Sequence, residues 1–120
     1  MATRILVVED SIDSRDLLVY LLEVEGFEVL SAENGKIAIE LAVVDKPDLI
    51  ITDIQMPVID GIEMIKRLRA QPDLKHTPIV VMTAFLTGMV SQALEVGANA
   101  AIQKPLQIEK LTQMIREMLS

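Results

Sequence analysis

The chain has 120 residues, of which 51% are apolar, and its formal net charge is −7. This length fits a single domain covering residues 1–120, and so apolar a chain is not intrinsically disordered. The acidic balance disfavours non-specific nucleic-acid binding, which depends on Lys and Arg, and the short apolar runs exclude a membrane span. The absence of cysteine excludes disulfides and thiolate metal sites; with no secretory signal at the N-terminus, it favours a cytoplasmic location.

The first half of the chain contains five predicted elements. Residues 5–8 form a continuous apolar run that predicts a strand, and the apolar spacing over residues 13–25 predicts a helix. Residues 27–32 predict a second strand, and residues 34–46 predict a second helix, which the following proline ends. Residues 49–53 are apolar and partly β-branched until the run reaches an aspartate, which is typical of a central strand covered on both faces.

The second half continues the same alternation. An Asp-Gly pair opens a predicted helix over residues 60–69, and a proline soon afterwards ends it. Residues 79–82 predict a fourth strand, residues 89–96 a weaker helix closed by a glycine, and residues 100–103 a short fifth strand. The final helix is predicted over residues 109–119.

Five strands that alternate with five helices predict an α/β fold with a mainly parallel, doubly wound sheet. Right-handed crossovers leave few topologies, and we expect the flavodoxin-like strand order 2-1-3-4-5, with the topological switch point between the first and third strands. In that order Glu9, Asp10 and Asp53 converge on the carboxyl edge of the sheet.

Polar residues at this edge suit phosphoryl transfer. Three neighbouring carboxylates repel one another unless a cation compensates, and oxygen ligands favour Mg²⁺ or Mn²⁺. Thr83 and Lys104 also follow buried strands, so both would lie beside Asp53. A hydroxyl, an ammonium and a divalent cation can bind phosphoryl oxygens while a carboxylate accepts the phosphoryl group.

Each candidate residue also has an ordinary structural explanation. The aspartates and the glutamate could belong to turns or solvated strand ends, the threonine could cap a helix, and the lysine could be a surface residue. His76 lies between two prolines and is predicted in a loop rather than as a phosphohistidine. The seven methionines are explained by core filling. The functional interpretation depends on all the candidates meeting at one edge of one sheet.

The sequence resembles the response-regulator receiver domains of two-component signalling, over residues 4–119. The motifs that carry the resemblance are, in chain order, Glu9-Asp10, the segment TDIQMPVIDG around Asp53, Thr83-Ala84 and Lys104-Pro105. In this family the proline after the lysine often follows a cis peptide bond. The resemblance implies a phosphorylation-dependent signalling switch that catalyses only its own phosphorylation and dephosphorylation, and is not an enzyme acting on a small molecule.

The resemblance also implies residue roles at the acceptor site. Asp53 would take the phosphoryl group from a histidine kinase or a histidine phosphotransfer protein. Asp10 and Asp53 would bind Mg²⁺ directly, with Mn²⁺ as a possible replacement. Glu9 would act mainly through metal-bound water, and the backbone carbonyl of Gln55 would supply another ligand.

The expected output differs from the usual pattern of the family. Thr83 and Lys104 would bind the phosphoryl oxygens and reshape the face made by the fourth helix, fifth strand and fifth helix, which would control a downstream protein. The family usually has an aromatic residue where this chain has Ala101. The segment after Ala84 also looks one residue short. We therefore expect helix and backbone shifts at the fourth helix to carry the output.

The residues that flank the phosphoryl group predict its lifetime. Gln55 and Phe85 match these two flanking positions, and Phe85 cannot orient a water molecule. The resemblance therefore predicts a long-lived phosphoaspartate.

Three other functions fit the sequence less well than a signalling switch. A phosphatase of the haloacid-dehalogenase type needs a second aspartate where Gln55 stands. A receiver-like scaffold that binds partners without phosphorylation is mildly favoured by Ala101 but not by the intact acidic site. A flavin carrier would need more aromatic residues. The chain ends just after its last predicted helix, so the sequence does not distinguish a stand-alone regulator from part of a longer one, and names neither kinase nor pathway.

Overall fold

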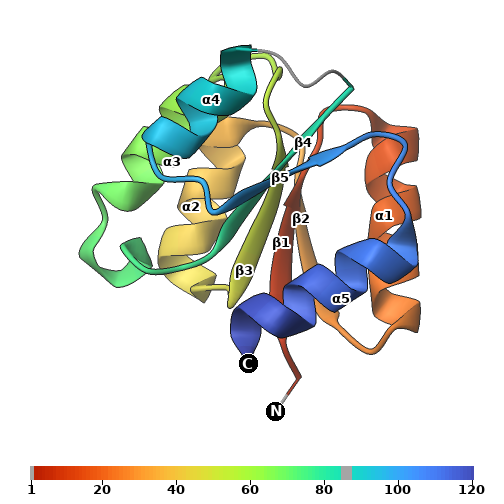
Figure 1. The fold of residues 1–120 in the computed structure, drawn as a ribbon. Coiled ribbons are helices and arrows are strands. Elements are labelled where there is room, and N and C mark those ends of the chain that lie inside the picture. The colour runs from red at the N-terminus through yellow and green to blue at the C-terminus, as the bar shows by residue number, and fades with distance from the viewer. Residues whose placement is uncertain (1, 85–87) are drawn as a thin grey trace.

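A computed structural model of the chain describes residues 2–84 and 88–120. The described residues form one five-stranded parallel sheet in the order β2-β1-β3-β4-β5 (Figure 1). Its strands are β1 (Arg4–Val8), β2 (Glu28–Ala32), β3 (Leu49–Asp53), β4 (Ile79–Thr83) and β5 (Ala100–Gln103). The fold class and the strand order predicted from the sequence are both confirmed.

The helices are α1 (Ile12–Val24), α2 (Gly35–Asp45), α3 (Gly61–Arg69), α4 (Gly88–Glu95) and α5 (Ile108–Leu119). Among the described residues, helices α1 and α5 cover one face of the sheet, and α2, α3 and α4 cover the other (Figure 1). A short 3-10 helix, Pro72–Leu74, was not predicted. No helix in the described ranges has both the length and the apolar character that crossing a membrane requires.

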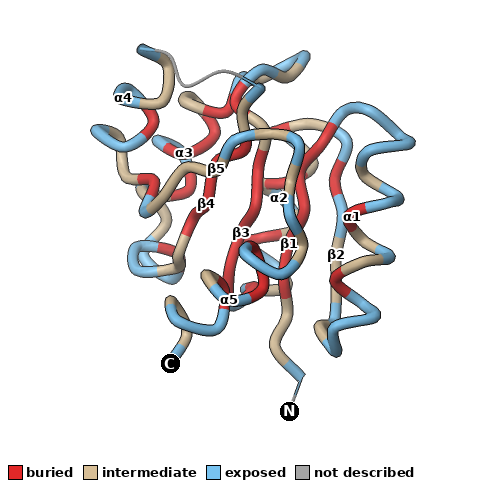
Figure 2. The backbone as a smooth tube through the Cα atoms, turned by 45° about the vertical axis from the view of Figure 1, so that its right-hand side comes forward, coloured by how far each residue is buried: buried red, intermediate tan, exposed pale blue. Residues whose placement is uncertain are grey.

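The core consists of two clusters, one on each side of the sheet. Along β3, Ile50 faces the cluster under α2, α3 and α4, whereas Leu49 and Ile51 face the cluster under α1 and α5. Successive side chains of a strand point to opposite faces, and both faces are covered, so β1, β3 and β4 are buried except for one end residue each (Figure 2). This explains why their sequences are continuous apolar runs rather than alternating ones.

Side chains near the carboxyl edge of the sheet fix where the helices begin. The N-cap residues Ser11, Asn34 and Asp60 accept hydrogen bonds from the backbone N–H groups of Ser14, Ile37 and Glu63. Each cap satisfies one of the N–H groups that a helix start leaves without an intrahelical partner. Three helices therefore start at defined positions directly after the loops that follow the strands.

Gly61 holds the loop after β3 against the strand. Its N–H donates to the carbonyl of Ile54 at 2.7 Å, and a Cβ atom at this position would lie 2.7 Å from the carbonyl oxygen of Asp53. Real Cβ atoms do not approach backbone this closely, so any larger residue must push α3 away from the end of β3.

We expect Gly61→Ala to lower the free energy of unfolding by about 1–3 kcal/mol, the range for overpacking a filled site. Gly88→Ala is the matched control, because an added Cβ at Gly88 meets nothing within 4 Å and alanine favours the helix. Urea unfolding of the two variants measures the difference. Equal stability of the two would contradict the close approach at Gly61.

Candidate functional site

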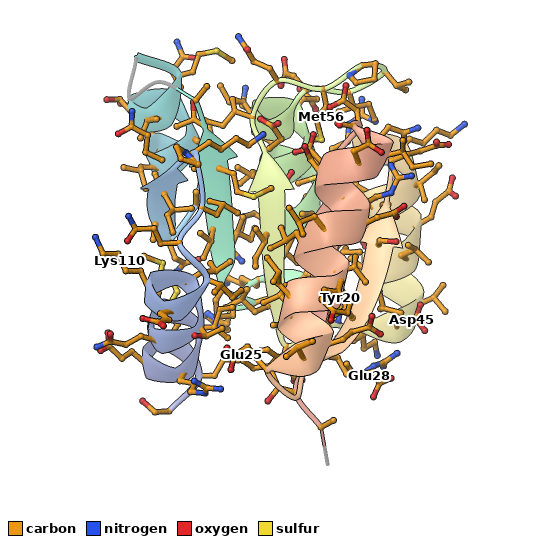
Figure 3. All side chains as sticks on the ribbon, turned by 90° about the vertical axis from the view of Figure 1, so that its right-hand side faces the viewer. Tyr20, Glu25, Glu28, Asp45, Met56 and Lys110 are labelled. Carbon is orange, nitrogen blue, oxygen red and sulfur yellow. The ribbon has the colours of Figure 1, made fainter. Side chains whose placement is uncertain are left out.

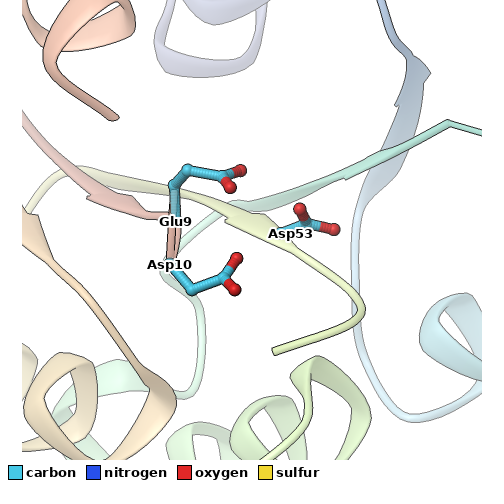
Figure 4. Close-up of side chains that lie close together, drawn as sticks. All are labelled: Glu9, Asp10 and Asp53. Carbon is cyan, nitrogen blue, oxygen red and sulfur yellow. The ribbon is translucent and has the colours of Figure 1, made fainter. Parts of the chain in front are cut away.

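Three carboxylates meet at the carboxyl edge of the sheet. Glu9 and Asp10 follow β1, and Asp53 is the last residue of the adjacent strand β3. Carboxylate oxygens of the three residues lie within 4.8 Å of one another, and Figure 4 shows the side chains converging. Glu9 is buried, Asp53 is half-buried and Asp10 is exposed, so the cluster opens to solvent on the Asp10 side.

Lys104 completes the site from the other half of the chain. Its Nζ lies 2.8 Å from Oδ2 of Asp53 and 3.1 Å from Oε2 of Glu9. Lys104 directly follows β5, and the peptide bond between Lys104 and Pro105 is cis. One ammonium group therefore bridges two of the three carboxylates.

The ionisation of the site reflects both burial and charge. Burial alone would lower the pKa of Lys104, but the hydrogen bond and the charge of Asp53, and then those of Glu9, outweigh it and raise that pKa. Burial raises the pKa of Glu9, the negative charge of Asp53 adds to the rise, and hydrogen bonds from Ser11 and Lys104 oppose it. Burial therefore disfavours the charged form of Glu9 more than its hydrogen bonds favour it.

Further hydrogen bonds hold Glu9 and Asp53 in place. The N–H of Ser11 donates to Oε1 of Glu9 at 3.2 Å, and the guanidinium of Arg15 donates to the Glu9 carbonyl at 2.9 Å. The N–H of Gln55 donates to Oδ1 of Asp53 at 3.3 Å. Both oxygens of the Asp53 carboxylate thus accept a hydrogen bond.

A cavity of about 170 Å³ lies beside Asp53. Since one water takes up about 30 Å³ of the liquid, it has room for a small polyatomic group and water. Its lining residues come from the ends of the strands, the loop after β3 and the first turn of α4: Asp53, Ile54, Gln55, Thr83, Ala84, Met89 and Lys104.

The donor set fits a hard divalent cation. Glu9, Asp10 and Asp53 supply carboxylate oxygens only, with one ammonium group to balance three negative charges. Mg²⁺ prefers carboxylate oxygens and retains water on its open side, and the exposure of Asp10 leaves such a side. The acidic cluster could therefore hold Mg²⁺.

The fold and the site define a class of signalling module. A model described as the response regulator receiver domain matches residues 5–116, and the chain belongs to this family of two-component systems. The polar-differentiation response regulator DivK of Brucella anthropi is 33% identical over 120 residues, which cover 99% of this chain and 98% of the relative. Membership of this family implies two kinds of partner: a histidine kinase or phosphotransfer protein as donor, and a downstream target.

Solved structures agree with this assignment. The chemotaxis response regulator CheY4 of Vibrio cholerae is 32% identical with a TM-score of 0.93, over 99% of this chain and 100% of that one. The receiver domain of a sensor histidine kinase of Pseudomonas aeruginosa was solved with a magnesium ion in its active-site cleft. It is 28% identical with a TM-score of 0.93, over 99% of this chain and 98% of that one.

The structure places all six candidate residues at one edge of the sheet: Glu9, Asp10, Asp53, Gln55, Thr83 and Lys104. Phe85, named in the prediction of a long phosphoryl lifetime, lies outside the described residues. His76 lies exposed in a turn, as predicted. The sequence did not indicate that Met89 would line the cavity, because its helical spacing equally suits core packing.

We expect Glu9→Gln to raise the free energy of unfolding of the metal-free protein at pH 7, on the order of 1 kcal/mol. Burial raises the pKa of folded Glu9 above its ordinary value of 4.5, so the folded state holds the proton more tightly. Stability therefore falls as pH rises from about 4.5 through the folded pKa, so the cost of burying the charge is greater at neutral pH than at pH 4.5.

Thermal unfolding in a chelator at pH 7 and at pH 4.5 checks this prediction. The gain from Glu9→Gln should shrink at the lower pH, and the variant should bind Mg²⁺ more weakly. Glu95→Gln, on the exposed surface of α4, should change neither. A variant less stable than the parent at pH 7 would contradict the argument from burial.

Proposed function

We propose that the protein is a phosphorylation-dependent switch in which Asp53 accepts a phosphoryl group from a histidine kinase or a histidine phosphotransfer protein. The strongest support is the position of the Asp53 carboxylate, with Lys104 at 2.8 Å, two more carboxylates close by and an adjacent cavity. Transfer to a carboxylate needs an accessible nucleophile and fixed positive charge around the phosphoryl oxygens.

In the proposed transfer an oxygen of Asp53 forms a bond to phosphorus while the phosphorus–nitrogen bond of the donor phosphohistidine breaks. The imidazole nitrogen keeps the electron pair of that bond. Thr83 and Lys104 both line the cavity, and their hydroxyl and ammonium groups would bind the phosphoryl oxygens. Lys104 must then share its positive charge between Asp53, Glu9 and the new group.

The residues that would hold the divalent cation are Asp10, Asp53 and the carbonyl of Gln55, with Glu9 acting through water. Mg²⁺, or Mn²⁺ in its place, would offset negative charge on the phosphoryl oxygens. Without such a cation, an incoming phosphoryl group meets three carboxylates and one ammonium group. We therefore expect phosphorylation to require the metal.

The surface beside the site suits the donor protein. A groove of about 260 Å³ between α1 and the segment after β5 includes Glu9 and Lys104 among its lining residues, so it reaches the acidic site. Leu17, at 59% exposed, lines it, and Tyr20, at 64% exposed, lies on the outer side of α1 (Figure 3). Large exposed apolar side chains next to a reactive group favour docking of a protein. We assign this face to the phosphodonor.

The output is proposed to reach a downstream protein through the face formed by α4, β5 and α5. Thr83 ends β4 and Lys104 follows the adjacent strand β5. A shift of either residue would therefore displace the backbone next to α4, β5 and α5. Ala101 is half-buried against the core and has no ring that could swing. Amide NMR shifts near residues 83–84 and 88–103 should therefore change on phosphorylation.

The decisive test uses Mg²⁺ and phosphoramidate, a small donor that needs no partner protein. Intact mass should increase by one phosphoryl group in the parent protein and in Asp73→Asn, an exposed control. Asp53→Asn should gain none. Uptake by Asp53→Asn, or no uptake by the parent with Mg²⁺ present, would overturn the assignment, and the second result would favour a scaffold.

A further inference from the structure

The cavity beside Asp53 has one wall that comes from a helix rather than from a strand end. Met89, in the first turn of α4, lines it together with Asp53, Gln55 and Lys104. The Met89 side chain is half-buried and packs against the core cluster under α2, α3 and α4. Because it is packed in this way, the Met89 side chain moves when α4 moves.

Met89 also contacts Gln55, an exposed residue of the loop after β3 that follows Asp53 by two positions. The amide nitrogen of Gln55 donates to the sulfur of Met89 at 3.6 Å, while the Gln55 backbone N–H donates to the Asp53 carboxylate. The Gln55 side chain is thus directed toward α4, although its backbone belongs to the acceptor site. A thioether is a weak acceptor, so this contact directs Gln55 without binding it tightly.

Loss of the phosphoryl group from Asp53 requires a water molecule in this cavity. The water oxygen forms a bond to phosphorus, the bond from phosphorus to the Asp53 oxygen breaks, and the water releases its protons to solvent and phosphate. A side chain that orients this water speeds the step, as a glutamine amide can do in other phosphoryl transfers. The thioether of Met89 is too weak an acceptor to orient this water, and Met89 borders the space that the water would enter.

We propose that Met89 is a positioning residue that prolongs the lifetime of the phosphoryl group on Asp53. It does so by excluding water from the helix side of the cavity and by directing the Gln55 amide away from the phosphoryl group. This inference rests on the proposed function. It links the lifetime of the signal to the position of α4, because a shift of α4 carries Met89 away from the cavity.

The test compares Met89→Ala with Met89→Leu in the full chain. Each protein is loaded with phosphoramidate and Mg²⁺, the donor is removed, and the remaining phosphoprotein is followed by intact mass. We expect Met89→Ala to lose the phosphoryl group at least about fivefold faster than the parent. Leucine keeps the bulk but lacks the sulfur acceptor, so Met89→Leu should decay at an intermediate or unchanged rate.

A double variant separates the two effects. If release of the Gln55 amide causes the faster decay, adding Gln55→Leu to Met89→Ala should slow it, since the two side chains act together. If access of water dominates, the double variant should decay as fast as Met89→Ala. Both results support a role for Met89.

Failure of the inference is distinguishable from failure of the proposed function. Loading of the parent and of Met89→Ala with equal decay rates would overturn the role of Met89 and leave Asp53 as the acceptor. No loading of the parent would instead overturn the proposed function. If Met89→Leu loses the phosphoryl group as fast as Met89→Ala, and both variants also unfold at a lower temperature than the parent, α4 is generally loosened. That result would reject the specific role of Met89.

Discussion

Arg69→Met should destabilise the protein by about 3 kcal/mol, since hydrogen bonds to a charged group each contribute roughly 1.5–3 kcal/mol and several are lost together. The Arg69 guanidinium donates to the carbonyls of Leu74 at 2.9 Å, Thr77 at 2.7 Å and Gly97 at 2.8 Å. It also donates to Oδ1 of Asn99 at 2.8 Å. The change should lower Tm by roughly 10 °C for a domain of this size.

These contacts join three segments at the end of the sheet opposite the acidic site. Arg69 ends α3, Leu74 and Thr77 precede β4, and Gly97 and Asn99 connect α4 to β5. Asn99 is itself held, because its Oδ1 accepts from the N–H of Ile79 at 2.9 Å. Burial lowers the pKa of Arg69, yet an arginine keeps its charge at any ordinary pH. The group therefore acts as a constant anchor.

Arg67, two residues earlier in the same helix, provides the control. Arg67 pairs with Glu63 at 3.1 Å, with the two side chains 53% and 46% exposed, and such surface pairs contribute about 0.5 kcal/mol or less. Arg67→Met should therefore leave Tm nearly unchanged, and Arg69→Lys should recover only part of the loss because an ammonium cannot reach so many carbonyls. Equal losses in Arg67→Met and Arg69→Met would reject the anchor.

Arg69 also shows what the sequence could not predict. Most of its partners are backbone carbonyls of loops, and a carbonyl is present at every residue whatever its side chain. A hydrophobic pattern therefore contains no signal for this cluster. The spacing of α3 identifies its buried face, but not which of its two arginines folds back across the end of the sheet.

The edge that carries the acidic site was predictable because its residues follow apolar runs that can be recognised in the sequence. The apolar runs that end at Glu9, Asp53 and Thr83 are long enough to mark strands, and crossover rules place their carboxyl ends together. Lys104 is 51 residues from Asp53 in the chain, yet their side chains meet. Distances, burial and the direction of the Gln55 side chain needed the structure, because they depend on packing of α4 that no local pattern encodes.

Lys104→Met should lower the free energy of unfolding of the metal-free protein by about 2 kcal/mol at pH 7. Removing one partner of a buried ion pair costs more than this when the remaining charge stays fully buried. Here the Glu9 side chain is only 5% exposed but the Lys104 side chain is 31% exposed, so solvent screens part of the interaction. Lys110→Met, on the exposed side of α5 (Figure 3), is the matched control.

The pH dependence of the same variant tests whether the ammonium charge is responsible. The pKa of Lys104 is raised above its ordinary value of 10.5, so the folded state holds the proton more tightly than the unfolded state. The stabilisation is complete below about pH 10.5 and is lost as pH rises through the folded pKa. Lys104→Met should lack this alkaline decrease, whereas Lys110→Met should retain it.

Magnesium then separates the charge of Lys104 from its packing. A bound divalent cation supplies the positive charge that the methionine variant lacks, so Mg²⁺ should raise the Tm of Lys104→Met more than that of the parent. In a chelator the two proteins should differ most. If Mg²⁺ stabilises both proteins equally and the alkaline decrease persists in Lys104→Met, the ammonium is not what balances Asp53 and Glu9, and the electrostatic basis for placing a phosphoryl group there is lost.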